Sequence, residues 1–426
     1  MAEQYWVETL GCPKNQVDSD KLVGSLVRDG LSEARSAGEA DLVVVNTCAF
    51  IEEARQESID TILQLGDDRK EGAKLVVTGC MAERYGDELA EALPEVDAVT
   101  GFNRSVNLAH PKRIDSPGLD VVSAPLPDFD LLNLPRPPAT APWAYVKIAE
   151  GCDRQCGFCA IPSFRGKQRS RSMESILKEV DELGAREIVL VAQDLARYGK
   201  DLDVPVPFEP LVQQVAERVD RVRLLYLYPS ELTESLIETI LATEVPYFDL
   251  SLQHVSRPLV KRMRRWGDGK KYAASIARIR QLEPEATMRS NFIVGYPGET
   301  EDDHELLLRF VEEMQLDWCG FFAFSDEEAT YAHGLDGHVP SELIKQRLTE
   351  LTALQDSITA HRRDRFVDTK LEVLVDEPGI GRSVHEAPEI DGIVYLDSDL
   401  VVGELCEVTI VESMGPDLVA SGAVVS

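Results

Sequence analysis

The sequence predicts an α/β protein with an N-terminal parallel α/β domain, a central partial (β/α)6 barrel and a small all-β barrel at the C-terminus. Three observations support this. Apolar runs alternate with helical stretches over residues 1–115 and again over 143–365, which is typical of parallel sheets. Residues 366–426 instead carry short β-type runs separated by glycine and proline, which is typical of a small barrel. A chain of 426 residues is also long enough for two or three domains.

In the N-terminal domain, residues 1–115, we expect three strands that each end on a cysteine. They cover residues 5–12, 41–48 and 74–80 and end at Cys12, Cys48 and Cys80. Helical stretches separate them. Because parallel strands end at the same edge of a sheet, the three thiols can converge there. The alternative is that these are three unrelated cysteines buried at strand ends.

Residues 116–142 are rich in proline and are predicted to form a stiff linker. Residues 143–365 then repeat a strand followed by a helix, and end in a long helix expected over 340–365. The expected strands cover 143–152, 187–194, 222–229, 247–253, 287–297 and 319–325. In such sheets the functional groups gather at the carboxyl ends of the strands.

The first of these central strands leads into Cys152, Cys156 and Cys159, a C-x3-C-x2-C spacing. Three thiolates in one short loop can bind three irons of a 4Fe–4S cluster, which leaves the fourth iron open to a small chelating molecule. A zinc site is the alternative, but structural zinc sites want a fourth ligand and usually show paired C-x2-C spacings. A disulfide would leave one cysteine over.

This spacing, with Phe158 before the last cysteine, resembles the radical S-adenosylmethionine superfamily. The resemblance implies that the open iron binds S-adenosylmethionine, whose cleavage gives a 5′-deoxyadenosyl radical. It also implies that Phe158 lies near the adenine, that Glu187 and Gln193 contact the methionine part, and that Arg289 contacts ribose or carboxylate. Equally, Arg289 can be an ordinary ion-pair partner and Glu187 a solvated charge.

Further motifs resemble the methylthiotransferase family. They are GCPKNQVDS at 11–19, NTCAFI at 46–51 and TGCMAER at 78–84. The resemblance implies a second 4Fe–4S cluster on Cys12, Cys48 and Cys80 that takes part in sulfur delivery. The two open irons are then expected to face one cavity.

Stretches at 190–199, 324–337 and 385–392 resemble the RimO type, which methylthiolates the β-carbon of an aspartate in ribosomal protein S-twelve. A methylthiotransferase acting on a modified adenosine of transfer RNA is the alternative. A non-catalytic iron–sulfur carrier is a second alternative, of a different class.

The tail, 366–426, resembles a TRAM domain, a module that often binds RNA. Here it holds 13 acidic and 2 basic residues, within a chain of net charge −31. Negative surface repels phosphate and attracts a basic protein, which favours S-twelve over transfer RNA. We therefore expect Asp391, Asp397, Asp399 and Glu404 to help dock the ribosomal protein.

The chemistry calls for further partners. They are S-twelve, free or in the small subunit, a reductant such as flavodoxin or ferredoxin, and a sulfur source. No run of about 18 apolar residues occurs, so no membrane contact is expected. The N-terminus lacks the pattern of a signal peptide, and a cytoplasmic location is expected.

Overall fold

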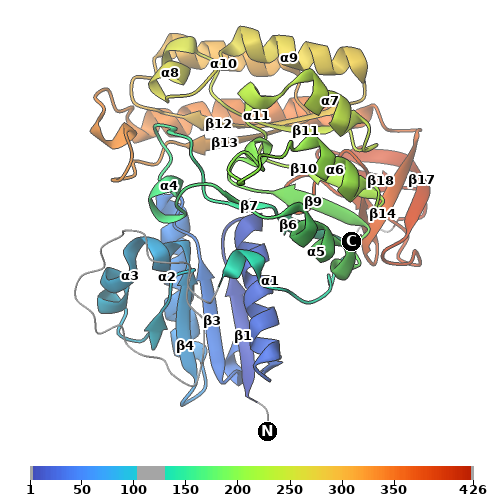
Figure 1. The fold of residues 1–426 in the computed structure, drawn as a ribbon. Helices are drawn as coiled ribbons and strands as arrows, with labels where there is room; N and C mark the ends of the chain where they lie inside the picture. The colour runs from blue at the N-terminus through green and yellow to red at the C-terminus, as the bar shows by residue number, and fades with distance from the viewer. Residues whose placement is uncertain (1–2, 103–129, 424–426) are drawn as a thin grey trace. The chain divides into compact units, whose positions relative to one another are not determined.

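The computed structural model describes residues 3–102 and 130–423 (Figure 1). Most of the predicted linker, 116–142, therefore lies outside the described residues. The chain divides into two compact units, which we describe separately. The first comprises residues 1–137, 149–153 and 159–171, and the second comprises 138–148, 154–158 and 172–426.

The first unit contains a five-stranded parallel sheet with the order β2-β1-β3-β4-β5. Its larger elements are β1 Gln4–Thr9, α1 Pro13–Arg28, β3 Leu42–Thr47, α2 Glu52–Asp68, β4 Lys74–Gly79 and α3 Cys80–Ala92. The shorter ones are β2 Ser32–Glu33, η1 Ala37–Glu39, β5 Ala98–Val99, η2 Leu131–Asn133, β7 Ala149–Glu150, α4 Ile161–Phe164 and β8 Arg169–Ser170. This confirms the predicted parallel sheet.

Alternation along β3 builds a separate core on each face of this sheet. Val44 faces Leu22 and Leu26 of α1, whereas Val43 and Val45 face α2 and α3. Successive side chains of a strand point to opposite faces, so a strand that is apolar throughout is covered by helices on both sides. Figure 1 shows α1 and the α2–α3 pair on either side of the strands.

The second unit begins with six parallel strands. They are β6 Trp143–Lys147, β9 Glu187–Val191, β10 Arg221–Leu224, β11 Tyr247–Gln253, β12 Thr287–Val294 and β13 Trp318–Ala323. They form two three-stranded sheets, β6-β9-β10 and β11-β12-β13, and the bridge between Leu227 and Leu250 links the two. All six expected strands are present, and they form the predicted partial barrel.

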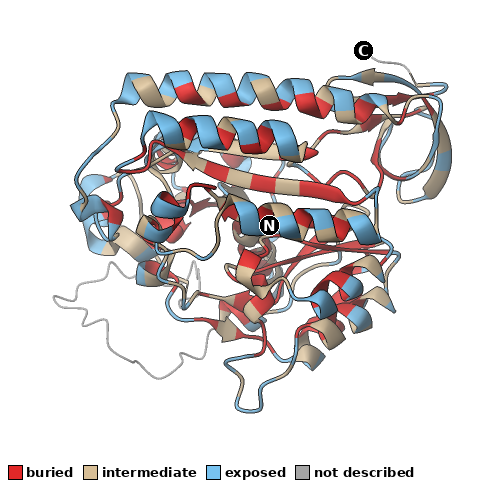
Figure 2. Cartoon of the chain, turned by 90° about the horizontal axis from the view of Figure 1, so that it is seen from above, coloured by how far each residue is buried: buried red, intermediate tan, exposed pale blue. Residues whose placement is uncertain are grey.

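Helices follow the strands of this barrel. They are α5 Met173–Leu183, η3 Leu195–Arg197, α6 Glu209–Ala216, η4 Pro229–Glu231, α7 Glu234–Leu241, α8 Arg257–Arg262, α9 Gly269–Leu282, α10 Glu301–Met314, η5 Ala332–Gly334 and α11 Ser341–Asp364. The last matches the helix predicted over 340–365. Figure 2 shows buried strands beside helices whose buried and exposed residues alternate, as amphipathic helices require.

The C-terminal residues close into a small barrel with the order β14-β15-β16-β18-β17. Its strands are β14 Lys370–Glu377, β15 Ile380–Arg382, β16 Val394–Tyr395, β17 Leu405–Met414 and β18 Asp417–Ala420. Val373, Val375, Ile410 and Leu418 fill its interior. The predicted all-β tail is confirmed.

Candidate iron–sulfur sites

The three N-terminal cysteines lie at the carboxyl ends of three neighbouring strands. Cys12 caps α1 after β1, Cys48 follows β3 directly, and Cys80 begins α3 directly after β4. The strands end level, because Thr9 pairs with Asn46 and Asn46 pairs with Thr78. The structure therefore brings all three cysteines to one edge of the sheet.

Two glycines allow the backbone to approach this edge closely. A Cβ atom at Gly11 would lie 2.9 Å from Cys48 Sγ, and a Cβ atom at Gly79 would collide with Asn46 and with the backbone of Thr47. Both glycines have positive φ, +94° and +95°, a conformation that other residues rarely adopt. The turn before α1 and the turn before α3 both depend on this freedom.

Asn15 ties the edge together from within the first turn of α1. Its Nδ2 donates to the carbonyl oxygens of Leu10 at 2.8 Å and of Thr47 at 3.0 Å. The backbone carbonyl oxygen of Asn15 accepts from Asn46 Nδ2 at 2.9 Å. The loop that holds Cys12 is thereby fixed to the end of β3, next to Cys48.

Arg165 is a buried cation at the same edge. Its Nη2 donates to Cys80 Sγ at 3.0 Å and to Asn15 Oδ1 at 2.6 Å, while its Nη1 pairs with Asp18 and Glu150, each at 2.9 Å. Only 2% of its side chain is exposed. Arg165 could not be assigned to this site from the sequence, because it lies six residues after Cys159 and 85 residues from Cys80.

The protonation of these thiols fits a site for positively charged iron. Burial raises the pKa of Cys48 to about 12 and also raises that of Cys80, and neighbouring thiols of the set add to both shifts. Arg165 acts in the opposite direction on both pKa values. Iron binds cysteine as the thiolate. Positively charged iron offsets the repulsion among three neighbouring thiolates, so these cysteines suit an iron site.

The second set of cysteines lies in the loop after β7. The backbone N–H of Cys152 donates to the carbonyl of Gly166 at 3.0 Å within the first unit. In the second unit, the N–H of Gly157 donates to the Met263 carbonyl at 2.7 Å, and the Gly157 carbonyl accepts from Ala332 N–H at 2.8 Å. Backbone hydrogen bonds therefore hold the residues on either side of Cys156.

Two arginines of the second unit flank Cys156. Arg154 pairs with Asp194 and with Glu231, both at 2.6 Å, and Arg265 Nη1 donates to Cys156 Sγ at 3.3 Å. Both guanidinium groups lie over the ring of Tyr228, at 3.9 and 4.2 Å from its centroid. These five residues were not among the predicted cofactor contacts, although Arg154 stands between two of the cysteines and Asp194 and Glu231 follow barrel strands.

Two predicted cofactor contacts lie at the carboxyl end of the barrel strands. Phe158 packs against Met263 and Tyr296 beside Cys156 and Cys159 in sequence. Gln193 lies two positions after the last residue of β9 and is partly exposed. Both positions are suited to a ligand held at this end of the barrel.

Glu187 and Arg289 lie at the other end. Glu187 is the first residue of β9 and is fully buried, where it accepts from Arg223 at 2.8 Å and from Arg382 of β15 at 3.0 Å. Arg223 and Arg382 lower the pKa of this carboxylate although its burial acts to raise it.

Arg289, in the first half of β12, pairs with Asp391 at 3.2 Å and with Asp249 at 3.4 Å. Together with the contacts of Glu187, these pairs favour a structural role, in which both residues fasten the C-terminal barrel to the amino ends of the strands. For Arg289, these ion pairs agree with the alternative that the sequence left open, an ordinary ion-pair partner.

Asp391 was also wrongly expected on the docking surface. Its side chain is fully buried and accepts from Tyr247 Oη at 2.5 Å and from the Ala387 N–H at 2.8 Å. By contrast, Asp399 and Glu404 are exposed and Asp397 is partly exposed. The sequence could not reveal this difference because the partner residues come from distant strands.

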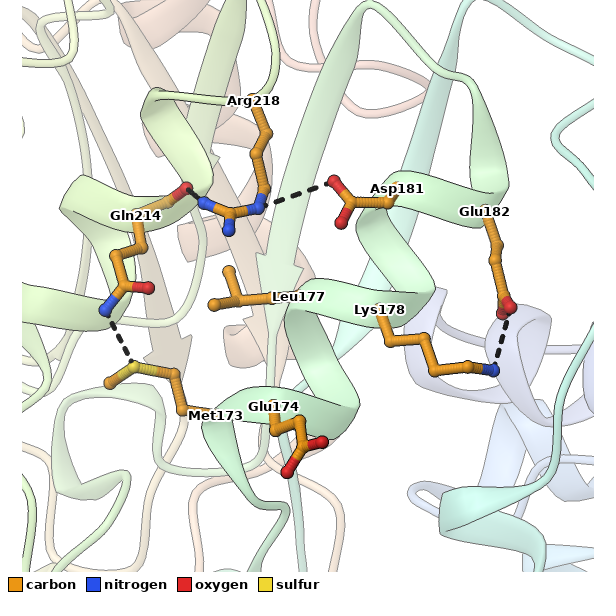
Figure 3. A pocket seen from close by; sticks show the side chains of 8 residues that line it. All are labelled: Met173, Glu174, Leu177, Lys178, Asp181, Glu182, Gln214 and Arg218. Atoms are coloured by element: carbon orange, nitrogen blue, oxygen red, sulfur yellow. Dashed lines mark hydrogen bonds and ion pairs between the residues drawn. The ribbon is translucent and has the colours of Figure 1, made fainter.

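A shallow pocket lies between α5 and α6 (Figure 3). Leu177 and Met173 form its apolar floor, while Arg218 approaches Asp181 at 3.4 Å and Lys178 pairs with Glu182 at 2.8 Å. Four of its five charged side chains are thus paired with one another, and its lining contains no cysteine. The pocket does not belong to either cysteine set.

No group of three or more His, Cys, Asp or Glu within residues 3–102 and 130–423 is arranged around a single metal ion. The thiolates of a 4Fe–4S cube bind different irons, so they do not need to converge on one point. The described part of the chain also contains no helix that is long and apolar enough to cross a membrane.

Three family profiles match the chain in succession. Residues 4–101 match Uncharacterized protein family UPF0004, residues 146–311 match the Radical SAM superfamily, and residues 367–422 match the TRAM domain. These matches agree with the parallel sheet, the partial barrel and the closed β-barrel described above.

Curated relatives align over nearly the whole chain. A ribosomal protein uS12 methylthiotransferase RimO from Saccharopolyspora erythraea is 42% identical over 96% of this chain and 93% of its own length. Proteins of the same name from Moorella thermoacetica and Geobacter sulfurreducens are 42% and 40% identical, over 92% and 98% of this chain and 93% and 98% of their own lengths. The chain belongs to the RimO family of radical SAM methylthiotransferases. The resemblance stated from the motifs is thereby confirmed.

Membership of the RimO family implies S-adenosylmethionine and iron–sulfur chemistry in this chain. Among solved structures, the cobalamin-dependent S-adenosylmethionine radical enzyme OxsB aligns with a TM-score of 0.49 and 12% identity, over 83% of this chain and 56% of that chain. A likeness this weak adds nothing to the assignment of the RimO family.

Proposed function

We propose that this chain methylthiolates ribosomal protein uS12 (S-twelve) at the β-carbon of an aspartate, using two 4Fe–4S clusters. The observation that carries the proposal is the convergence of Cys12, Cys48 and Cys80 at one sheet edge, in a chain that also has the C-x3-C-x2-C loop. A chain that only cleaved S-adenosylmethionine would need one set of three cysteines. The second set provides a place for the sulfur that is transferred.

With its cluster bound, the loop of Cys152, Cys156 and Cys159 supplies a carbon radical from S-adenosylmethionine. An aspartate β-C–H is not acidic enough for a side-chain base, whose contribution is about 10²–10⁴-fold, so hydrogen abstraction is the route that fits. The protein holds this loop in place through the Gly157 backbone and through the pairing of Arg154 with Asp194. Phe158 and Gln193 are the residues we assign to contact with S-adenosylmethionine.

The C-terminal barrel has the surface charge that a basic protein substrate requires. Eight of its acidic side chains are exposed, whereas Arg382 is buried and Lys370 is paired with Glu407 at 2.7 Å. The exposed acidic residues are Asp368, Glu372, Glu377, Glu389, Asp399, Glu404, Glu407 and Glu412. This supports uS12 over transfer RNA, because phosphate contacts need lysine and arginine.

The reaction also needs a reductant such as flavodoxin or ferredoxin and a source of sulfur. Its ribosomal substrate, free or in the small subunit, places the enzyme in the cytoplasm. These partners are part of the proposal.

The decisive experiment is anaerobic reconstitution of the full chain. We expect about eight irons in the wild type and about four in a Cys152/Cys156/Cys159→Ala variant, because each set of three thiolates holds one cube. Incubation with S-adenosylmethionine, reductant, sulfide and either uS12 or transfer RNA, followed by mass spectrometry, then identifies the substrate. A methylthio group on adenosine and none on uS12 would contradict the proposal.

Docking is tested by neutralising two exposed charges of the C-terminal barrel. Asp399→Asn with Glu404→Gln should weaken uS12 binding by about two- to thirtyfold at low salt, since each exposed charge contributes about 0.2–1 kcal/mol and salt screens it. Glu88→Gln with Glu91→Gln makes the same change in net charge on exposed positions of α3 and serves as the control. Equal loss of affinity in both variants would count against a role for the barrel.

A further inference from the structure

A structural salt bridge alone does not explain the position of Arg165. It follows α4, and its guanidinium group is enclosed by side chains from several segments of the first unit. The ring of Phe102 lies against one face, with its centroid 4.0 Å from Cζ. The group is therefore fixed and cut off from water.

The two arms of the guanidinium group have different partners. Nη1 faces the carboxylates of Asp18 and Glu150, and Nη2 faces Asn15 Oδ1 and Cys80 Sγ. A group that only balanced the two carboxylates would have no need to donate to a thiol. The planar guanidinium group of arginine can donate to both groups of partners at once, whereas the ammonium of lysine is a single point charge.

We propose that Arg165 is a positioning residue that orients Cys80 and raises the reduction potential of the cluster on Cys12, Cys48 and Cys80. This inference rests on the proposed function. Hydrogen bonds and positive charge at a cluster sulfur stabilise the more negative, reduced state, and burial strengthens both effects. The carboxylate of Asp18, paired with Arg165 at 2.9 Å, partly offsets this charge.

Because Arg165 and Asp18 carry opposite charges, the proposal predicts shifts of opposite sign in the reduction potential when each is replaced. In the full chain with Cys152/Cys156/Cys159→Ala, the remaining cluster can be titrated by itself, with spectra recorded at controlled potentials. Arg165→Met should raise the ratio of oxidised to reduced cluster about tenfold at a fixed potential, which is about 59 mV for a one-electron couple. Arg165→Lys should give a smaller change of the same sign, and Asp18→Asn a change of the opposite sign.

Arg136→Met is the matched control. Arg136 is also an arginine of the first unit with 2% of its side chain exposed, and it pairs with Asp20 at 2.7 Å, farther along α1 from Cys12. Its loss should leave the potential unchanged. A general effect of losing a buried cation would shift the potential in this variant too, and that result would overturn the proposal.

Iron content separates the two levels of the argument. If the triple cysteine variant binds no iron, the cluster assignment in the proposed function fails. If it binds about four irons and the potential is the same with Arg165→Lys and Asp18→Asn as without them, only the role of Arg165 is overturned. Because these two variants keep the charge or the shape of the buried pair, the test remains decisive even if Arg165→Met does not fold.

Discussion

The two cysteine sets reach their positions by different means. Cys12, Cys48 and Cys80 come from three β/α turns that are separated by more than thirty residues each, and the parallel sheet brings them together. Cys152, Cys156 and Cys159 lie within one loop of eight residues. The first set is therefore a property of the folded sheet, whereas the second is largely a property of local sequence. The same donor chemistry can thus depend on folding to very different degrees.

The arginines beside the two sets show the same contrast. Arg165 is buried and its charge is balanced by Asp18 and Glu150. Arg265 is partly exposed, and within the described residues it has no carboxylate partner and instead donates to the Ser251 carbonyl and lies over Tyr228. A buried cation needs counter-charges, and a partly hydrated one does not.

The largest expected effect separates the two sets by reaction step. Cys80→Ala should lower the iron content from about eight to about four and methylthiolated uS12 by at least a hundredfold, while 5′-deoxyadenosine is still formed. Cys156→Ala should abolish both products, because under the proposed function the cluster that binds S-adenosylmethionine is held by the loop set. Chromatography of the nucleoside and mass spectrometry of uS12 measure the two outputs. Loss of 5′-deoxyadenosine in both variants would show that the sets do not divide the work in this way.

The second prediction concerns acid stability, which should differ between the units. Burial lowers the pKa of His254 and of His385 to about 4, and both belong to the second unit. The described part of the first unit contains no histidine. A histidine that is buried neutral contributes stability that is fully present above its unfolded pKa of 6.5 and is lost as pH falls toward 4. The full loss is about 3 kcal/mol per histidine, at about 1.4 kcal/mol per pKa unit.

Urea unfolding between pH 7 and 4 measures this loss. With Trp6→Phe the remaining tryptophans, Trp143, Trp266 and Trp318, all report on the second unit. His385→Gln should flatten the dependence of that unit's unfolding free energy on pH. Four buried carboxyl groups with raised pKa values act against this loss of stability at low pH. They are present with and without His385→Gln, so the difference between the two proteins isolates the histidine. They are Asp194, Glu299, Asp376 and Asp391.

The third and smallest effect compares the glycines beside the two sets. Gly79→Ala should destabilise the first unit by about 1–3 kcal/mol, because Gly79 has a positive φ and a Cβ atom there would meet the backbone of Thr47. Gly157 has no positive φ, and the nearest atom to a Cβ there is the side-chain atom Tyr296 Oη, 2.8 Å away, so Gly157→Ala should cost about 1 kcal/mol, less than Gly79→Ala. Equal losses in urea unfolding would mean that the first set depends on its backbone no more than the second.

Several features of the site could be predicted from the sequence for physical reasons. Strand alternation and helix length are local, so the parallel sheet, the six barrel strands and the β-tail were all expected, and so was the convergence of three strand-end cysteines. The residues whose roles could not be predicted are those whose partners are far away in the chain. Arg165 donates to Cys80 across 85 positions, and Asp391 is buried by Tyr247 and Arg289 from barrel strands.

The sequence by itself determined which sulfur atoms we propose as iron ligands, because cysteine spacing and strand order are properties of the chain. Tertiary structure decided which charged side chains serve those atoms and which only hold the fold together. Glu187 and Asp391 are buried by arginines that are distant in the sequence, and Arg165 is enclosed by Asp18, Asn15 and Cys80. The reason is that a charge acquires its role from its neighbours and its exposure to water, and only the folded chain sets both.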